Sequence, residues 1–471
     1  MPTPPELPPE IWRHILSYID SSVLLPICGV NHLFHDVALD HRYRRVWLGY
    51  ISDARILKIK SLKDPWLAKR VKSLYLATGA VGARADASRV ALPVSKAKSH
   101  AGYSDILSSF LPSVVRKRVT YGLAEDIIDG TQLDVTSTSA ESLLPLLYVV
   151  LDQLKNVSEL DIIADHTGDS DFELDFLRKL CCLFASRSVQ ALGLRIYELH
   201  LILPFTQFVG LKKVSLTLLP SPNPSALSAD AFSQLLQFLN RIAPSVEVLC
   251  FATPDYGIVE QLSSSLHPMT MPNVRELETP LMFNDLGTNQ SLDSKYPSLS
   301  VLKLYPWSPR EGLTQSLGCL QLVGLRSLTL SSLGEVSVPS LFGNGSSGFP
   351  HLEELRIINE YLFSDNVDMI CKFFASSSIT RLELYLFYLN AHILDSTSLY
   401  FPVLHTFDLR TVYVTLATEP GSIGLRERQY PDWHVSVINL KLSPEAPEEI
   451  VHLLQRCIPN LHVVNAERLL F

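Results

Sequence analysis

Few residues in the sequence are arranged to do chemistry, and the nearest approach is a group of metal-ligand types close to the N-terminus. Cys28, His32, His35 and His41 follow one another closely. Thiolate and imidazole are the ligands that zinc prefers, and His32 and His35 could share one face of a helix. They lie in a short segment of helical pattern, where an exposed helix surface is the simpler interpretation. We therefore predict no metal site.

A glycine-rich stretch at residues 343–348 is the other feature that resembles a chemical motif. Its sequence, Gly-Asn-Gly-Ser-Ser-Gly, has the glycine content of a phosphate-binding loop. It lacks the Lys-Ser/Thr pair that follows such a loop and the buried strand that precedes it, so a connecting turn is the better interpretation. The sequence also contains no serine-hydrolase, zinc-protease or dinucleotide-binding motif. We expect a protein that is not an enzyme and has no cofactor.

The composition predicts a large buried core. The chain has 471 residues, of which 47% are hydrophobic and 19% charged, and this argues against long disordered tracts. The seven cysteines are scattered and odd in number, which is typical of free thiols in a reducing compartment. The longest apolar run, residues 143–151, is too short to cross a bilayer, and the N-terminus lacks a secretory signal. We expect a cytoplasmic or nuclear protein, or one found in both, without membrane association.

Charge is unevenly distributed. The net charge of −8 argues against a general nucleic-acid binder. Residues 42–72, however, contain ten Lys or Arg against Asp53 and Asp64, which gives this segment about +8 and the remainder about −16. We interpret residues 51–72 as basic helices that follow the N-terminal segment. Their charged face could meet an acidic partner or simply be solvated.

The N-terminal segment has the pattern of several short helices. Pro8 and Pro9 can open a helix, because its first turn does not use their missing N–H groups. Between residues 11 and 19 the apolar side chains recur at helical spacing as one wide stripe. Pro26 and Gly29 must break or kink any longer helix. The product is a helical cluster too small to be well stabilised alone.

This order of residues resembles an F-box, the short helical module that docks onto the Skp-type adaptor of cullin-based ubiquitin ligases. The resemblance rests on residues 7–11 (Leu-Pro-Pro-Glu-Ile), on residues 15–20 (Ile-Leu-Ser-Tyr-Ile-Asp), and on looser matches at Leu24, Val30, Asn31, Phe34, Ala38 and Trp47. Pro26 and Gly29 depart from the smoother helix of most members. The resemblance implies binding to the adaptor and, through it, to a cullin scaffold. The matching positions that would contact the adaptor are Leu7, Pro8, Ile11, Ile15, Leu16, Leu24, Val30 and Phe34.

An apolar triplet at positions i, i+3 and i+5 recurs along the rest of the chain. It first occurs as Val71, Leu74 and Leu76, and from residue 142 it alternates with helical segments. The later triplets begin at Val157, Val189, Leu211, Val246, Val274, Leu299, Leu325, Leu352, Ile379, Leu404, Val437 and Leu461. From Val246 onward the starts are 24 to 33 residues apart. A recurrence so close to a fixed period indicates a repeat protein.

The strand period of two explains the triplet. Its second and third members point into a core, whereas the residue between them points to the opposite face. One strand cannot bury its apolar side alone, so stacked units would form a parallel sheet with returning helices. Ser228 and Ser364 are candidate caps for two of these helices. The pattern resembles a leucine-rich-repeat solenoid, although the usual Asn or Cys after the triplet is replaced, which predicts irregular repeats.

These features predict an α/β protein in three parts. Residues 1–50 form the F-box-like helical module. Residues 51–141 contain linking helices, a first repeat and a flexible loop at about 79–102. Residues 142–471 form a curved leucine-rich-repeat solenoid with a parallel sheet and helical connectors.

The outward residues of the predicted strands form rows of mixed charge with Tyr and Arg, a composition suited to protein recognition. An ordinary solvated face is the alternative. The residues that we expect to contact a protein substrate are Glu278, Lys303, Tyr305, Arg356, Arg381, Glu383, Tyr385, Asp408 and Arg410.

An F-box-like module joined to a leucine-rich solenoid resembles the substrate receptor of an SCF-type ubiquitin ligase, in particular the F-box proteins of fungi. The module would bind the adaptor, and the solenoid would bind a protein that the sequence does not identify. Three alternatives remain. The first is a leucine-rich scaffold or regulator unrelated to ubiquitin, whose N-terminal helices merely cap the first repeat. The second is a nucleic-acid binder that uses residues 42–72, and the third is an enzyme.

Overall fold

The protein is described from a computed structural model and is divided into two compact units. The N-terminal unit comprises residues 1–223 and 227–242, and the C-terminal unit comprises residues 224–226 and 243–471. The structure describes residues 7–16, 18–19, 23–24, 29, 31–48, 53–78, 140–164, 171–197, 201, 205–219, 228–253, 258, 261, 269–280, 292–305, 317, 320, 322–331, 341–342, 349–414, 424–442 and 449–468. The predicted loop at 79–102 lies outside them.

The N-terminal unit begins with helices: α1 (Pro9–Leu16), α3 (His32–Arg44), α4 (Asp53–Ser61) and α5 (Pro65–Ala68). Helix α1 starts at Pro9, as the missing N–H groups of the two prolines predict. Asn31 caps α3, because its Oδ1 accepts a 2.9 Å hydrogen bond from the Phe34 N–H. Asp64 caps α5 through a 2.8 Å hydrogen bond from the Trp66 N–H.

The strands of this unit are parallel and follow chain order: β1 (Arg45–Leu48), β2 (Ser73–Ala77), β3 (Glu159–Ile163), β4 (Ala191–Ile196) and β5 (Lys213–Leu218). The connectors are α9 (Ala140–Gln153), α10 (Asp171–Ala185), the short 3₁₀ helix η2 (Phe205–Gln207) and α11 (Ala229–Ile242). Ser228 caps α11 as expected, since its Oγ accepts a 3.3 Å hydrogen bond from the Ala231 N–H.

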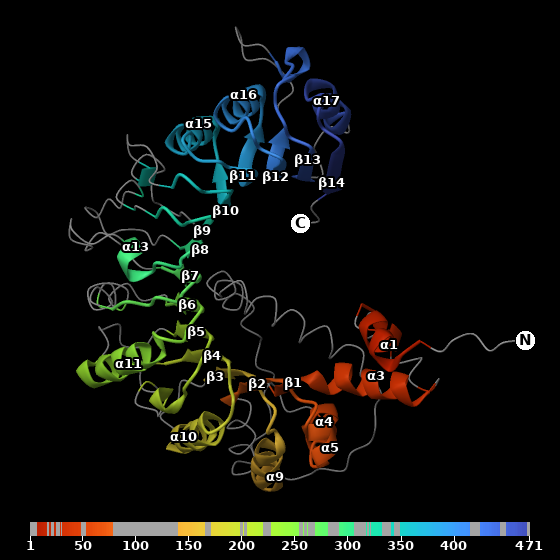
Figure 1. Cartoon of the computed structure of the whole chain (residues 1–471), viewed down its shortest axis with the longest axis vertical. Coiled ribbons are helices and arrows are strands. Elements are labelled where there is room, and N and C mark those ends of the chain that lie inside the picture. Colours follow the sequence, from red (N-terminus) through yellow and green to blue (C-terminus); the bar gives the residue numbers. More distant parts are fainter. Residues whose placement is uncertain are drawn as a thin grey trace, which may run out of the picture. The chain divides into compact units, whose positions relative to one another are not determined.

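The C-terminal unit repeats the same alternation. Its strands are β6 (Val248–Ala252), β7 (Glu276–Thr279), β8 (Val301–Leu304), β9 (Ser327–Ser331), β10 (Glu354–Leu362), β11 (Arg381–Leu389), β12 (Thr406–Val414), β13 (Val437–Leu442) and β14 (Val463–Arg468). Its helices are α13 (Leu292–Lys295), α15 (Ser364–Phe373), α16 (Ala391–Tyr400), η4 (Leu425–Glu427) and α17 (Ile450–Cys457). Adjacent strands pair in parallel, and Figure 1 shows the helices of each unit along one face of its strands.

The apolar triplets form the cores of both units. In the C-terminal unit, Leu328, Leu355 and Leu382 are fully buried register partners on successive strands. Their neighbours two residues later are equally buried. The α/β class with a parallel sheet is thus confirmed, because each strand buries its inner side against the next repeat and against the helices.

The triplet of β13 begins at Val435 and not at Val437, because Ile438 and Leu440 pair with Phe407 and Leu409 of β12.

Two other expectations about local structure are wrong. The predicted helical module, residues 1–50, contains strand β1, so its last part already belongs to the parallel sheet. The triplet of β1 is Tyr43, Val46 and Leu48, all buried, with an aromatic first member. Ser364 does not cap α15. It is the first residue of that helix, and its Oγ instead accepts a 2.8 Å hydrogen bond from Asn390.

Candidate protein-docking surfaces

Helix α1 divides the predicted apolar stripe between two faces. Leu16 has no exposed surface and packs with Leu24 and Val37 in a small core, to which Ile19, Leu33 and Phe34 contribute partly. The Trp12 ring lies 5.5 Å from that of Phe34, so Trp12 belongs to this inner face. Ile11 and Ile15 stand four residues apart on the same side of the helix and do not belong to the core. The module therefore has its own core, and some of its apolar residues lie outside that core.

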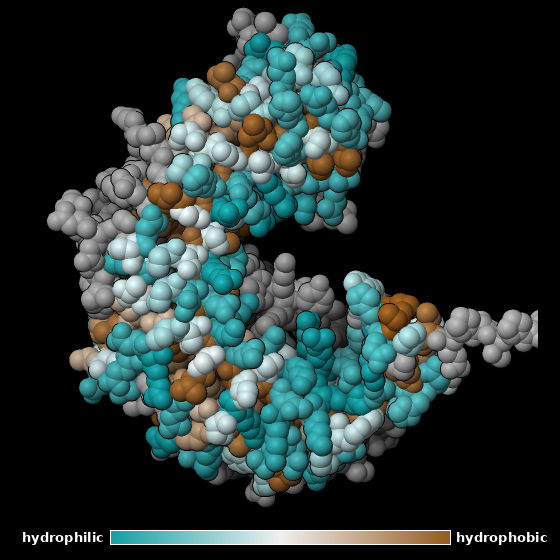
Figure 2. Space-filling model, viewed as in Figure 1, coloured by the Kyte–Doolittle hydropathy of each residue, from teal (hydrophilic) through white to brown (hydrophobic). Residues whose placement is uncertain are grey.

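The outer face is an exposed apolar surface. Leu7 and Ile11 are each 45% exposed, Ile15 is 39% exposed, and Pro8 is also exposed. We call these four residues the α1 surface. Tyr18 and Val23, which follow α1 in the chain, are 78% and 52% exposed. Figure 2 shows hydrophobic residues gathered on this N-terminal module. Neither Tyr18 nor Val23 is among the predicted adaptor contacts, although residues 15–20, which resemble an F-box, include Tyr18.

The eight predicted adaptor contacts therefore fall into three groups. Leu7, Pro8, Ile11 and Ile15 lie on the α1 surface. Leu16, Leu24 and the half-buried Phe34 build the small core and support that surface from within. Val30 lies outside the described residues.

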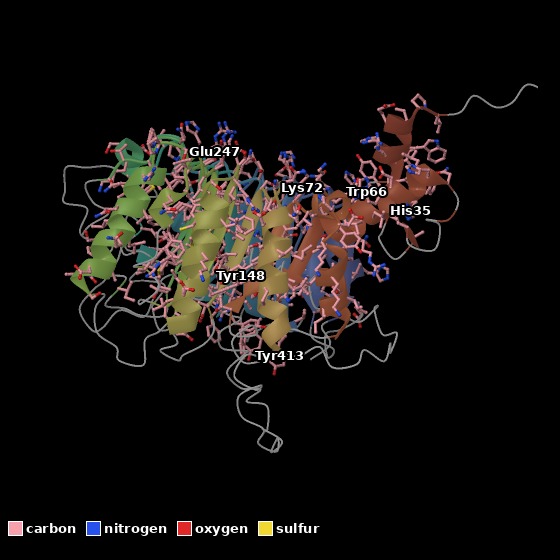
Figure 3. The ribbon with its side chains drawn as sticks, turned by 90° about the horizontal axis from the view of Figure 1, so that it is seen from below. His35, Trp66, Lys72, Tyr148, Glu247 and Tyr413 are labelled. Atoms are coloured by element: carbon pink, nitrogen blue, oxygen red, sulfur yellow. The ribbon has the colours of Figure 1, made fainter. Side chains whose placement is uncertain are left out.

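One arginine joins the module to the first repeat. Arg70, just after α5, forms ion pairs with Asp36 and Asp40 of α3, and its Nη1 donates a 3.1 Å hydrogen bond to the Asp36 carbonyl. The guanidinium also stacks 4.0 Å from the ring centroid of Trp66. Burial opposes the charged form, but the hydrogen bonds and charges of the two aspartates prevail and raise the pKa of Arg70. Figure 3 shows His35 of α3 and Trp66 at this part of the N-terminal unit.

The predicted substrate residues lie in register across the strands of the C-terminal unit. One row contains Glu278, Lys303, Thr329, Arg356, Glu383, Asp408 and Asn439, each the direct partner of the next. Tyr385 and Arg410 are partners two residues further along. The parallel stacking thus brings together residues that are 25 to 31 positions apart in the sequence.

Most charges on this face neutralise one another. Lys303 Nζ lies 2.6 Å from Glu276, Arg356 Nε donates a 2.5 Å bond to Glu383, and the Arg381 guanidinium lies 2.8 Å from Asp408. Asp408 also accepts a hydrogen bond from Asn439, which accepts one of 2.7 Å from Asn465. The hydrogen bond to Asp408 raises the pKa of Arg381, although burial opposes it. Glu276 and Glu278 likewise outweigh burial and raise the pKa of Lys303.

Glu278 differs from the expectation of an outward, solvated residue. Its side chain has no exposed surface, and it accepts a hydrogen bond from the Tyr305 hydroxyl. Lys303 Nζ lies 3.8 Å from its other oxygen. A buried carboxylate persists when charged and hydrogen-bonding partners surround it. Glu278 and Tyr305 therefore serve the cohesion of β7 and β8, and Glu278 is not available to a partner.

The described residues contain no group of three His, Cys, Asp or Glu side chains that could hold a metal ion. His32 and His35 are exposed on α3, whereas Cys28 is outside the described part of the chain. The buried thiols of Cys181 and Cys371 have a raised pKa because burial disfavours the thiolate. In the segments that the structure describes, none of the helices combines the length and the apolar character needed to span a membrane.

Comparisons with known proteins identified no relative of the chain. No protein-family model matches the chain, and a search of curated proteins found no match.

Proposed function

We propose that the protein is the substrate receptor of an SCF-type ubiquitin ligase. The helices before β1 form an F-box that binds a Skp-type adaptor, and the repeats form a leucine-rich solenoid that binds a protein substrate. The chain itself carries out no chemistry, since it acts by bringing the substrate close to a ubiquitin-charged enzyme.

The α1 surface carries the proposal. Helices that merely capped the first repeat would turn their apolar residues towards that repeat. Here Leu16, Leu24 and Val37 already fill the core of the module, while Leu7, Ile11 and Ile15 remain exposed. Exposed apolar residues that cluster on one helix face indicate a protein interface. Their positions are also those that the resemblance assigns to adaptor contacts.

The test is co-elution of the purified protein with a Skp-type adaptor, using an Ile11→Ala/Ile15→Ala variant. Removing two partly exposed isoleucine side chains from an interface costs about 2–4 kcal/mol, which weakens Kd roughly 30- to 800-fold. Leu16 is unsuitable for this test, because it is completely buried and its replacement would disrupt the module.

A Val149→Ala variant is the matched control, since Val149 on α9 is 52% exposed and lies outside the α1 surface. We expect the wild type and this control to form a one-to-one complex and the double variant to lose it. Circular dichroism checks that all three proteins are folded. A folded wild type that forms no complex, or a double variant that binds like the control, would reject the F-box assignment and favour a leucine-rich scaffold.

A further inference from the structure

Strands β10, β11 and β12 are longer than the other strands described in the C-terminal unit. Each has nine residues, against four to six in the others. The apolar triplet explains only the first part of each strand. The additional residues carry aromatic side chains past the polar rows, towards the carboxyl ends of the strands.

Four aromatic rings near these strand ends are connected through contacts with Phe387. Phe387 lies 5.3 Å from Phe363, 4.8 Å from Tyr388 and 5.5 Å from Tyr413, and the Tyr388 and Tyr413 rings are 5.6 Å apart. Phe363 is 53% exposed, Tyr388 40% and Tyr413 42%. We call these four residues the aromatic surface. Figure 3 shows Tyr413 at the opposite edge of the C-terminal unit from Glu247, which precedes β6.

Two acidic residues lie within three positions of Phe363 in the sequence: Glu360 and, in the first turn of α15, Asp365. Strand β10 contains an irregularity between Ile357 and Leu362, where Asn359 adopts a positive φ of 63°. Glu360 follows in this bulge, and Asp365 lies two residues after Phe363. Within the described part of the chain, neither carboxylate has an ion-pair partner. This contrasts with the polar rows, where the acidic residues are paired.

The same strands already hold a guanidinium on a tyrosine ring. The Arg410 guanidinium of β12 lies 5.1 Å from the ring centroid of Tyr385 on β11, and Tyr385 is 6.2 Å from Tyr361. Faces of aromatic rings attract cations, and Arg is the side chain most often found there. Partly exposed tyrosine rings, together with two nearby carboxylates that lack ion-pair partners, thus offer a second cation a ring contact and charge complementarity.

We propose that the aromatic surface binds an extended, arginine-containing segment of a partner protein, with Glu360 and Asp365 contributing charge attraction. The aromatic surface shares none of its four residues with the polar rows. The proposal concerns the C-terminal unit alone and does not depend on adaptor binding by the α1 surface.

The experiment measures the fluorescence anisotropy of three labelled peptides with the full-length protein. The peptides are four repeats of Gly-Ser-Arg, of Gly-Ser-Gln and of Gly-Ser-Glu. We expect the arginine peptide to bind at least about tenfold more tightly than the glutamine peptide, and the glutamate peptide to bind least. Equal binding of the arginine and glutamine peptides, or no binding of the arginine peptide, would overturn the proposal.

Variants locate the contact. Tyr388→Leu/Tyr413→Leu keeps apolar bulk but removes the ring faces, and it should weaken binding of the arginine peptide about tenfold or more. Glu360→Gln/Asp365→Asn should weaken binding severalfold and reduce its dependence on salt. Leu399→Ala/Val403→Ala is the control, since these residues are 70% and 45% exposed elsewhere in the unit.

Thermal melts establish that each variant is folded, and Tyr413→Leu alone replaces the double variant if the latter is unfolded. A folded tyrosine variant that binds the arginine peptide as tightly as the wild type would refute the assignment of the aromatic surface.

Discussion

The attachment of the N-terminal helices to the first repeat depends on Arg70, and its replacement by Met tests this directly. The side chain is 10% exposed and connects the end of α5 to two carboxylates and one carbonyl of α3. Methionine keeps much of the apolar stem of the side chain but cannot donate a hydrogen bond. Asp36, which is 23% exposed, would then keep only the more distant Arg13, at 3.9 Å, as a charged partner among the described residues.

The magnitude follows from the exposure of each partner. The ion pair with Asp36, together with its carbonyl hydrogen bond, contributes about 1.5–3 kcal/mol. The Asp40 carboxylate is 54% exposed, so this pair contributes at most about 1 kcal/mol. Stacking on the half-exposed Trp66 adds about 0.5–1 kcal/mol. Because such interactions are not additive, we expect a total loss of about 2–4 kcal/mol.

Hydrogen exchange of the α3 amides is the appropriate assay, because the loss should appear as local opening of a small module. The expected loss corresponds to a fall in protection of roughly 30- to 800-fold. Arg13→Met is the matched control: Arg13 is 54% exposed and lies 3.9 Å from the same Asp36, so little should change. Unchanged protection of α3 in Arg70→Met, or an equal fall in the control, would refute the reasoning.

Two further predictions concern contacts between neighbouring repeats. Burial opposes the charged form of Asp368, yet hydrogen bonds from Lys372 (2.6 Å) and Ser396 (3.0 Å) lower the pKa of this carboxyl. The carboxylate therefore stabilises the fold above about pH 4, and this stabilisation is lost as pH falls through the folded-state pKa. Asp368→Asn should therefore lower the melting temperature slightly at pH 7 and less at pH 3; an equal effect at both would contradict this. A Cβ on Gly193 would lie 1.9 Å from Asp161 Oδ1. Gly193→Ala should therefore lower the free energy of unfolding, measured by urea denaturation, by about 1 kcal/mol. Asp161→Ala in the same chain should reduce that cost, and strictly additive effects would argue against the clash.

The repeated strands were predictable because their signal is local. The spacing within each triplet indicates which residues face inward, because the strand period of two follows from backbone geometry alone. Strand β1 was missed because Tyr43 takes the place of the leucine and the triplet begins within α3. A triplet pattern that also allows an aromatic residue at its first position predicts β1.

The candidate surfaces were predicted less completely. The inner and outer faces of α1 alternate within a few residues, and both are apolar, so the spacing did not separate Ile15 from Leu16. The burial of Glu278 depends on Tyr305, which is 27 residues away and comes close only through the pairing of β7 with β8. Sequence spacing within one repeat contains no information about such a contact.

The sequence by itself determined the repeating strand, the parallel α/β class and the grouping of polar residues on one sheet face. These depend on the alternation of side chains along a single strand, which every stretch of chain expresses locally. Tertiary structure alone decided which charges neutralise one another and which apolar residues of α1 remain exposed. It also decided that Phe363, Phe387, Tyr388 and Tyr413 meet. The physical reason is that burial and pairing are properties of neighbours, and in a stack of repeats those neighbours come from other turns of the chain.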